Sequence, residues 1–321
     1  MGRPGAAHDA MTTRARIVIS EFMDERAVAQ LAAVHDVLYE PQLVDDAARL
    51  ITEARRADVL IVRNRTQVRD ALLAALGQCK VVGRLGVGLE NIDVSGCAAK
   101  GIQVIPATGA NALSVAEYVI TSAMLLLRGA YASTPAVASG QWPRTALSNG
   151  RETAGQTLGI IGFGSIGQST ARLAQGLGMK VTAFDAMLQP DAPIFSQTGV
   201  NSIGLDELIS RSDVVTLHVP LVDTTRGLFD AARIAAMKKG AVLINTSRGH
   251  IVDLAAVAAA LHSGHLGGAA IDVFDVEPLP TDATLQNCPN LLLTPHISGV
   301  SAESNERVSF MIADKVLESL K

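Results

Sequence analysis

A glycine-rich turn is the first pattern in this chain that could do chemistry. An apolar run, TLGII, leads into it, and a helix-like stretch from Ile166 to Leu177 follows. Backbone N–H groups and the positive end of such a helix can bind a pyrophosphate. The residues that would form this cradle are Gly162, Gly164, Ser165, Ile166 and Gly167.

Asp185 closes the next apolar run, KVTAF, at roughly the distance after the glycines that is typical of a dinucleotide-binding fingerprint. Its carboxylate could accept hydrogen bonds from an adenosine ribose and would repel a 2′-phosphate. No arginine follows it within several residues. We therefore predict NAD rather than NADP as the cofactor. The alternative is a tight strand-to-helix turn with Asp185 as a solvated strand end.

Arg248, Glu277 and His296 each follow an apolar run further along the chain: AVLINT, GGAAIDVF and NLLLT. In an open parallel sheet, ligands bind at the carboxyl ends of the strands, so these residues could converge on a bound cofactor. Taken singly, each has an ordinary interpretation as a structural histidine, a turn residue before Pro278 or a solvated loop cation.

Short apolar runs alternate with helix-like stretches of about a dozen residues throughout the chain. This alternation predicts an α/β fold of two doubly wound parallel-sheet units, separated by an irregular stretch near 129–155. The final helix-like stretch, Ala302 to Leu320, has no strand after it and could pack on the first unit. The remaining expected strands are RIVIS, DVLIV, KVVGR, IQVI and DVVTLHV.

The composition excludes several classes of partner. The 27 basic and 31 acidic residues form no long run of either sign, so neither nucleic acid nor an anionic membrane is expected as a partner. The most apolar run, Val119 to Leu127, is far shorter than the ~20 residues of a membrane span and predicts a buried helix. Residues 1–14 are expected to form a disordered tail.

The three cysteines, Cys79, Cys97 and Cys288, lie far apart and lack CxxC spacing. They indicate neither a disulfide framework nor a zinc site, so no metal is expected. We interpret them as reduced thiols of a cytoplasmic protein.

Five further stretches, NTSRGHIVD, AIDVFDVEP, TPHISG, GVGLENID and NALSVAEYV, occur in order with the glycine motif. Together they resemble the D-isomer-specific 2-hydroxyacid dehydrogenase family over nearly the whole chain. The resemblance implies a flavodoxin-like substrate domain of residues 15–110 and 298–321. A Rossmann-type NAD-binding domain, residues 111–297, would be inserted into it, with the substrate in the cleft between them.

The resemblance also assigns the triad. It makes His296 the acid/base, Glu277 its partner and Arg248 the anchor for the substrate carboxylate and carbonyl. Reduction of a 2-oxo acid places negative charge on the carbonyl oxygen, so a proton donor and a fixed cation lower the barrier. A carboxylate bonded to the imidazole orients the ring and favours its protonated form. The family's formate-oxidising members carry glutamine here, so Glu277 favours proton transfer.

Other roles come from the same resemblance. His218 could instead be a packed strand histidine, and Asp272, expected at the nicotinamide amide, could instead be satisfied by backbone N–H groups. Many relatives carry arginine at the position of Ser165, so backbone N–H groups and the Ser165 hydroxyl must do more here. Expected at the cofactor are His218, Pro220, Thr246 and Asp272; expected at the substrate carboxylate are the backbone groups of Val87 and Gly88.

Arg63, Arg65 and Arg84 lie after or at the end of strand-like runs in the first unit. A second fixed cation would suit a substrate with a second anion, because guanidinium groups bind phosphate, sulfonate and carboxylate through paired hydrogen bonds. We favour Arg63 for this role. The candidate substrates are 3-phosphoglycerate, 3-sulfolactate and dicarboxylic hydroxy acids. The RNRT loop differs from the RSAT-like loop of phosphoglycerate enzymes, which favours 3-sulfolactate.

Relatives are commonly homodimers, so a homodimer is expected, with the segment from Val115 to Leu127 and the Trp142 region as plausible contacts. A rival interpretation is an NAD-sensing binding protein, since certain transcriptional corepressors resemble this family. A second rival is the serine-biosynthetic phosphoglycerate dehydrogenase. This chain resembles the first two domains of that enzyme, especially in the stretch VVGRLGVGLENID.

Overall fold

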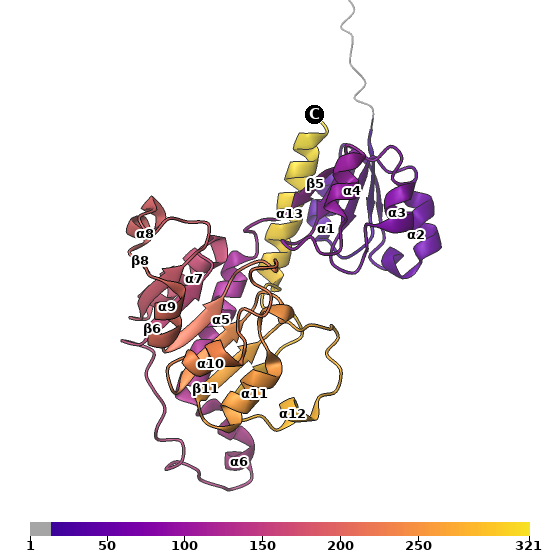
Figure 1. The fold of residues 1–321 in the computed structure, drawn as a ribbon. Coiled ribbons are helices and arrows are strands. Elements are labelled where there is room, and N and C mark those ends of the chain that lie inside the picture. The colour runs from indigo at the N-terminus through magenta and orange to yellow at the C-terminus, as the bar shows by residue number, and fades with distance from the viewer. Residues whose placement is uncertain (1–13) are drawn as a thin grey trace, which may run out of the picture. The chain divides into compact units, whose positions relative to one another are not determined.

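The apolar runs of the N-terminal third form a five-stranded parallel sheet in the first of two units (Figure 1). The computed structural model describes residues 14–321, so the expected tail lies outside the described residues except for Arg14. The first unit comprises residues 14–111 and Ser301–Lys321. Its strands are β1 Arg16–Ile19, β2 Asp36–Tyr39, β3 Val59–Val62, β4 Val81–Arg84 and β5 Gln103–Pro106.

The strand order of this sheet is β2-β1-β3-β4-β5, the order of a flavodoxin-like doubly wound sheet. Each of the three inner strands is buried on both faces, as their unbroken apolar runs predict. The helices of the unit are α1 Glu25–Ala32, the 3-10 helix η1 Leu43–Asp45, α2 Ala47–Ala54, α3 Asp70–Ala75, α4 Val94–Ala99 and α13 Ala302–Ser319.

Helices cover both faces of the first sheet. Helices α1 and α13 pack on one face through side chains such as Leu31 and Ile312, and α2, α3 and α4 pack on the other. A Cβ on Gly83 of β4 would lie 2.9 Å from Cγ2 of Ile312, so the glycine allows α13 to approach the sheet closely. The last helix therefore does return to the first unit, although nearly 200 residues separate it from β5.

The second unit, Ala112–Val300, contains a seven-stranded parallel sheet with the order β12-β11-β10-β9-β6-β7-β8. The order reverses between β6 and β9, as in a Rossmann fold. Its strands are β6 Thr157–Ile161, β7 Lys180–Phe184, β8 Asn201–Ser202, β9 Val214–Leu217, β10 Ala241–Asn245, β11 Leu266–Ile271 and β12 Leu291–Leu293.

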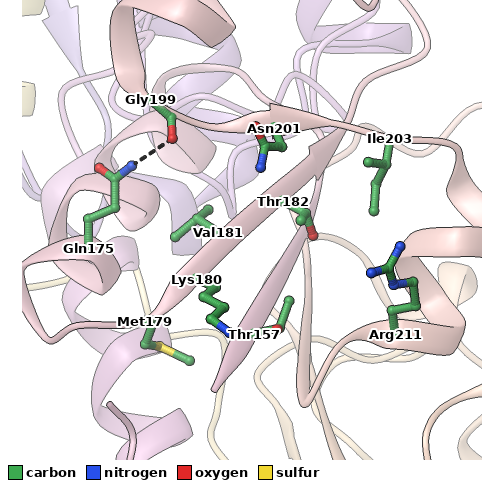
Figure 2. A pocket seen from close by; sticks show the side chains of 10 residues that line it. All are labelled: Thr157, Gln175, Met179, Lys180, Val181, Thr182, Gly199, Asn201, Ile203 and Arg211. Atoms are coloured by element: carbon green, nitrogen blue, oxygen red, sulfur yellow. Dashed lines mark hydrogen bonds between the residues drawn. The ribbon is translucent and has the colours of Figure 1, made fainter. Parts of the chain in front are cut away.

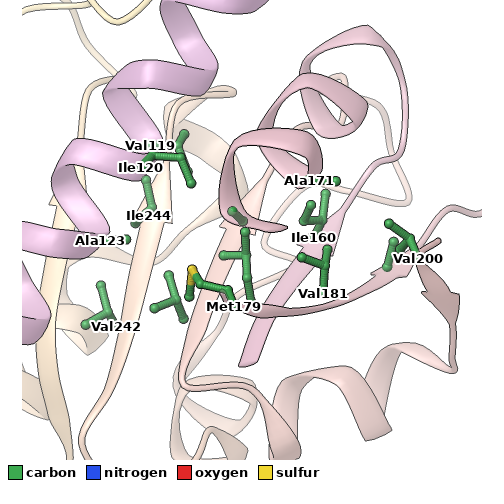
Figure 3. Close-up of a cluster of buried hydrophobic side chains, with 14 of the residues drawn as sticks. Val119, Ile120, Ala123, Ile160, Ala171, Met179, Val181, Val200, Val242 and Ile244 are labelled. Atoms are coloured by element: carbon green, nitrogen blue, oxygen red, sulfur yellow. The ribbon is translucent and has the colours of Figure 1, made fainter. Parts of the chain in front are cut away.

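Helices α5, α7 and α8 bury one face of this sheet, and α9, α10 and α11 bury the other. Figure 3 shows side chains of α5 gathered against those of the strands. The helices of the unit are α5 Ala112–Arg128, η2 Tyr131–Ser133, α6 Thr134–Ala138, α7 Ser165–Gly176, α8 Pro193–Thr198, α9 Leu205–Arg211, α10 Ala231–Ala236, η3 Gly249–Ile251, α11 Leu254–His262 and α12 Ala283–Gln286.

The helix α5 contains the segment that is expected at a dimer contact, and one face of this helix is buried. Val115, Val119, Ala123 and Leu127 all pack into the core of the second unit, where each large side chain stabilises the fold by roughly 1.5–3 kcal/mol. Met124 of the same helix is 39% exposed, so a dimer contact on this segment stays a prediction. Trp142, by contrast, is 76% exposed.

The sequence did not predict two strands, β2 and β8. Each lies at an edge of its sheet, and they carry the partly polar stretches DVLY and NS, which lack the apolar signal of the inner strands. Several expected strands also end early. The strand β9 ends at Leu217 and β11 at Ile271, so His218 and Asp272 lie just beyond their strands rather than within them.

Within residues 14–321, no single helix has the length and apolar composition needed to cross a membrane. Ala112–Arg128 and Tyr131–Ala138 pass that test only as a pair, and the pair is bent by 71°.

Candidate active site at the carboxyl edge of the second sheet

Six neighbouring strands, β12, β11, β10, β9, β6 and β7, deliver the expected site residues of the second unit to one edge. Parallel strands all end on the same side, so each residue that follows a strand lies at that edge. The glycine loop follows β6 and sits where the strand order reverses, which is the usual ligand position in a doubly wound sheet.

The three glycines of the loop each serve a different steric purpose. Gly162 has φ +95°, and a Cβ there would lie 2.4 Å from the carbonyl oxygen of His218. A Cβ on Gly167 would lie 2.3 Å from the oxygen of Gly162, so the glycine brings α7 close to β6. Gly164, the residue before α7, faces open space, which leaves its backbone and that of Ser165 and Ile166 accessible to a pyrophosphate.

Asp185 is tied directly to the glycine loop. Its Oδ2 accepts a hydrogen bond from the backbone N–H of Phe163 at 2.7 Å, and its Oδ1 accepts one from Met187 at 2.8 Å. A carboxylate has about four acceptor positions, so two remain for ribose hydroxyls. This geometry fits the expected role of Asp185 in holding an adenosine ribose.

Two groups between the glycine loop and Arg248 also fit a cofactor. The buried hydroxyl of Thr246 has no hydrogen-bond partner among the described residues, so a ligand could supply one. The ring Nε2 of His218 lies 3.1 Å from Oγ1 of Thr216, and burial lowers the pKa of His218 to about 3, so the imidazole is neutral. Pro220 follows His218 and is exposed.

His296 and Glu277, which the sequence predicts to act as an acid/base pair, lie in hydrogen-bond contact. His296 Nδ1 lies 2.8 Å from Glu277 Oε2, and Glu277 Oε1 accepts a hydrogen bond from the backbone of Phe274 at 3.0 Å. Because the carboxylate engages Nδ1, the Nε2 atom is left to face a substrate. Both side chains are substantially exposed, at 50% and 37%. The pair can therefore exchange a proton with a ligand at this edge.

The backbone of His296 is strained, with φ +53°, a value that residues other than glycine rarely adopt. Its N–H donates to the carbonyl oxygen of Asp272 at 2.8 Å. The Asp272 carboxylate, which is 0% exposed, accepts three more hydrogen bonds, from Thr294 Oγ1 and from the backbone of Ile297 and Ser298. Asp272 thus holds the loop that carries His296.

Asp272 was expected either to contact the nicotinamide amide or to be a structural carboxylate satisfied by the protein, and its hydrogen bonds bear on that choice. The structural one requires donors from the protein, and the structure supplies them at 2.6–2.9 Å. Tyr118 of α5 extends the network, since its hydroxyl lies 2.7 Å from Thr294 Oγ1. Burial raises the pKa of Tyr118, which keeps that hydroxyl protonated. Sequence reasoning missed Tyr118, although it lies in the NALSVAEYV stretch.

The loop of Arg248 packs against the loop of Glu277. A Cβ on Gly249 would lie 2.0 Å from the carbonyl carbon of Phe274, so only glycine permits this approach. Asn245 secures the same loop by donating from Nδ2 to the Arg248 carbonyl at 2.9 Å. The Arg248 guanidinium donates to the Ser247 carbonyl at 2.5 Å. The loop of Arg248 thus contacts the loop of Glu277 directly. The loop of His296 is joined to them through Asp272, which follows the same strand as Glu277.

The expected substrate residues of the first unit follow the adjacent strands β3 and β4. Arg63 Nη2 donates to Asn305 Oδ1 of α13 at 2.6 Å, and its guanidinium lies 5.7 Å from the ring centre of Phe22. Arg65 instead forms an ion pair with Asp45. Arg84, the last residue of β4, donates to the Leu85 carbonyl at 3.1 Å. Beyond it, Val87 is exposed and Gly88 is half-buried.

Sequence reasoning missed two buried residues that support the Arg63 loop, Glu21 and Asn91. The signal for Glu21 was available, because this acidic residue comes directly after the strand-like run RIVIS, which ends at Ser20. Asn91 lies within the GVGLENID stretch, which carried the resemblance without being assigned this role.

A pocket of the second unit lies away from this site (Figure 2). Its lining includes Thr157 and Lys180, which begin β6 and β7, whereas the glycine loop and Asp185 follow the ends of those strands. The described residues also contain no group of three or more His, Cys, Asp or Glu that could hold a metal ion.

Comparison with known proteins identifies the architecture. The family model described as "D-isomer specific 2-hydroxyacid dehydrogenase, NAD binding domain" matches residues 120–298. The chain is 51% identical over 304 residues to the (S)-sulfolactate dehydrogenase of Chromohalobacter salexigens, covering 95% of this chain and 98% of that protein. It is 37% identical to the D-3-phosphoglycerate dehydrogenase of Bacillus subtilis, covering 95% of this chain but only 57% of that protein.

Among solved structures, the NAD-dependent formate dehydrogenase from Staphylococcus aureus, in complex with NAD, aligns with a TM-score of 0.79 at 27% sequence identity. The alignment covers 95% of each chain.

Proposed function

This chain belongs to the D-isomer-specific 2-hydroxyacid dehydrogenase family, and we propose that its substrate is a small D-2-hydroxy acid, or the matching 2-oxo acid, with a second anionic group. It is an NAD-dependent oxidoreductase of hydroxy acids. Of the candidates, we favour 3-sulfolactate. The 51% identical relative is named for (S)-sulfolactate, and the D-like isomer of sulfolactate carries the label S because sulfur outranks the carboxyl oxygens.

NAD, when bound, supplies or accepts the hydride at C2 of the substrate. We assign its pyrophosphate to the backbone at Gly164–Ile166, its ribose to Asp185, and other contacts to Thr246, His218 and Pro220. His296 gives a proton from Nε2 to the carbonyl oxygen during reduction, or takes it back during oxidation. Glu277 orients the ring through Nδ1.

Arg248 is proposed to hold the substrate carboxylate and carbonyl oxygen, where its charge offsets the negative charge that develops on that oxygen. Backbone N–H groups at Val87 and Gly88 would hold the carboxylate as well. In this assignment the first unit binds substrate and the second binds cofactor.

The observation that carries the second-anion proposal is the environment of Arg63. Among the described residues, the Arg63 guanidinium donates to an amide oxygen and lies over an aromatic ring, and the Glu21 carboxylate acts on it through its charge without forming an ion pair. Arg65, by contrast, has its charge matched by Asp45. A guanidinium that is not ion-paired can bind a sulfonate, phosphate or carboxylate through paired hydrogen bonds.

The test compares D-lactate with 3-sulfolactate, 3-phosphoglycerate and D-malate, each with NAD and NADP, in the wild type and in Arg63→Ala. We expect the wild type to prefer a dianion and NAD. Arg63→Ala should lower kcat/KM for that dianion by roughly 10- to 100-fold and change lactate by less than about threefold. The matched control, Arg65→Ala, should change neither.

Equal use of lactate and the dianions, or an equal loss for both in Arg63→Ala, would contradict the second-anion proposal. A chain that binds NADH but turns over no hydroxy acid would instead support the rival interpretation, an NAD-sensing binding protein.

Two further assignments belong to this proposal. We propose a homodimer whose contact includes the exposed Trp142 and Tyr131. We also propose a cytoplasmic location, consistent with three free cysteines, of which Cys79 and Cys97 are buried.

A further inference from the structure

We propose that Glu21 is a positioning residue for substrate selectivity, because it fixes the loop that presents Arg63. This inference rests on the proposed role of Arg63 and adds a residue that the role requires. It concerns the turn between β1 and α1, far in sequence from the triad.

The Glu21 carboxylate is the acceptor for a whole loop. Its two oxygens accept hydrogen bonds from four consecutive backbone N–H groups, at 2.9, 3.3, 3.0 and 3.0 Å. The donors are Arg63, Asn64, Arg65 and Thr66. Successive N–H groups that converge on one point form an anion-binding nest, and here the protein supplies the anion itself.

The neighbours of Glu21 contact the same loop. Ser20 Oγ lies 2.9 Å from Thr66 Oγ1, and the Phe22 ring lies under the Arg63 guanidinium. From the other side, Asn91 Nδ2 donates to the carbonyls of Arg63 and Thr66 at 3.2 and 2.7 Å. The loop is therefore fixed through both its N–H and its C=O groups.

A carboxylate is the group that this position demands. Glu21 is 4% exposed, and burial alone would favour its neutral form, yet hydrogen bonds from the backbone of Thr66, Arg65 and Arg63 and from the Thr66 hydroxyl hold its pKa below the usual range. Glutamine would offer one acceptor oxygen and turn an NH₂ group toward N–H donors. At least one buried N–H would lose its partner, and the loop would move.

The proposed consequence is local. Movement of the loop displaces Arg63 from Phe22 and Asn305, and so weakens binding of the second anion, while proton transfer at His296 continues. The Glu21 carboxylate is hydrogen-bonded to backbone N–H groups and forms no ion pair with the Arg63 guanidinium, whose own hydrogen bond is to the neutral amide of Asn305.

The experiment measures kcat and KM for the preferred dianion and for D-lactate in Glu21→Gln, Glu21→Asp, Arg63→Ala and the double variant Glu21→Gln/Arg63→Ala. We expect Glu21→Gln to raise KM for the dianion by roughly tenfold or more, with kcat and the lactate KM changed by less than about threefold. Glu21→Asp, which keeps the charge, should recover part of the loss. In the Arg63→Ala background, Glu21→Gln should cause no further loss for the dianion.

The matched control is Asp213→Asn. Asp213 is also 4% exposed and also accepts a hydrogen bond from a backbone N–H, that of Thr157 at 2.9 Å, but it lies in the second unit. The Asp213→Asn variant should have a lower midpoint of thermal unfolding, with the ratio of kcat/KM for the dianion to kcat/KM for lactate unchanged. Binding of NADH, followed by fluorescence, reports whether each variant is folded.

The outcomes separate the two proposals. If Arg63→Ala leaves the dianion preference intact, the proposed function fails. If Arg63→Ala removes the preference but folded Glu21→Gln keeps it, or the two effects add in the double variant, the positioning role is wrong. Should Glu21→Gln not fold, Asn91→Ser, which frees the loop carbonyls, must raise the dianion KM selectively; an unchanged dianion KM overturns the inference.

Discussion

In each unit a buried carboxylate holds the loop that carries a cationic or protonatable side chain. Asp272 lies under the loop of His296, and Glu21 lies under the loop of Arg63. Both carboxylates bind backbone N–H groups, and both are less than 5% exposed. The two loops are thus fixed by the same physical means.

The two loops differ in what touches the presented side chain. The His296 imidazole has a carboxylate partner, Glu277, at 2.8 Å. The Arg63 guanidinium has an amide and an aromatic ring. A side chain that must gain and lose a proton benefits from an anion that orients it and stabilises its charged form. One that must only attract an anion works better with neutral neighbours, which leave its charge to the ligand.

The largest effect is expected from removing the proton-transferring side chain. His296→Ala should lower kcat by roughly 100-fold or more for lactate and dianion alike, because both substrates need the same proton, while NADH binding stays nearly normal. Steady-state kinetics and NADH fluorescence titration measure the two quantities.

His262→Ala, at the exposed end of α11, is the control and should keep wild-type turnover. Near-normal turnover in His296→Ala would remove His296 from its role. A loss of kcat for the dianion alone would show that His296, like Arg63, serves only the second anion, and would contradict the proposed difference between the two residues.

A smaller effect is expected from the carboxylate beneath the His296 loop. Asp272→Asn should lower the free energy of unfolding by about 1–3 kcal/mol, because an amide cannot accept from all three donors. It should also lower kcat by roughly tenfold, since the strained backbone at His296 loses part of its support. Urea unfolding and steady-state kinetics measure these changes.

Asp230→Asn serves as the control, because asparagine caps helix α10 as well as aspartate does. If Asp272→Asn is as stable and active as this control, Asp272 does not hold the loop.

The smallest effect concerns a histidine at the same edge that has no carboxylate bonded to its ring among the described residues. Burial lowers the pKa of His218 to about 3, below the value of about 6.5 in an unfolded chain. Between these values only the unfolded state takes up the proton, so stability is lost as pH falls from 6.5 toward 3. His218→Gln should remove this loss, by up to about 2 kcal/mol at pH 5.

Urea unfolding of wild type and His218→Gln at pH 7.5 and pH 5 measures the difference. If the free energy of unfolding falls equally in both proteins between pH 7.5 and pH 5, His218 does not titrate in this way. The proposed contrast between a buried His218 and an exposed His296 would then be wrong.

The sequence alone determined the strands that matter for the site. Unbroken apolar runs mark strands buried on both faces, and a polar residue directly after such a run must lie at the carboxyl edge of a parallel sheet. This local rule located the glycine loop, Asp185, Arg248 and His296 without any tertiary information. It failed for the short, partly polar strands β2 and β8, whose pairing comes from neighbours rather than from their own pattern.

Only the tertiary structure decided which loop each buried carboxylate holds. Asp272 bonds Ile297 and Ser298, and Glu21 bonds a loop more than 40 residues away, because adjacent strands bring their ends together whatever lies between them in sequence. Asp272 and Glu21 look alike in the sequence as acids just after apolar runs. In the structure, hydrogen bonds and burial place Asp272 under the loop of His296 and Glu21 under the loop of Arg63. Sequence periodicity records burial residue by residue, whereas these partnerships depend on strand order and on the conformation of loops, which no local pattern encodes.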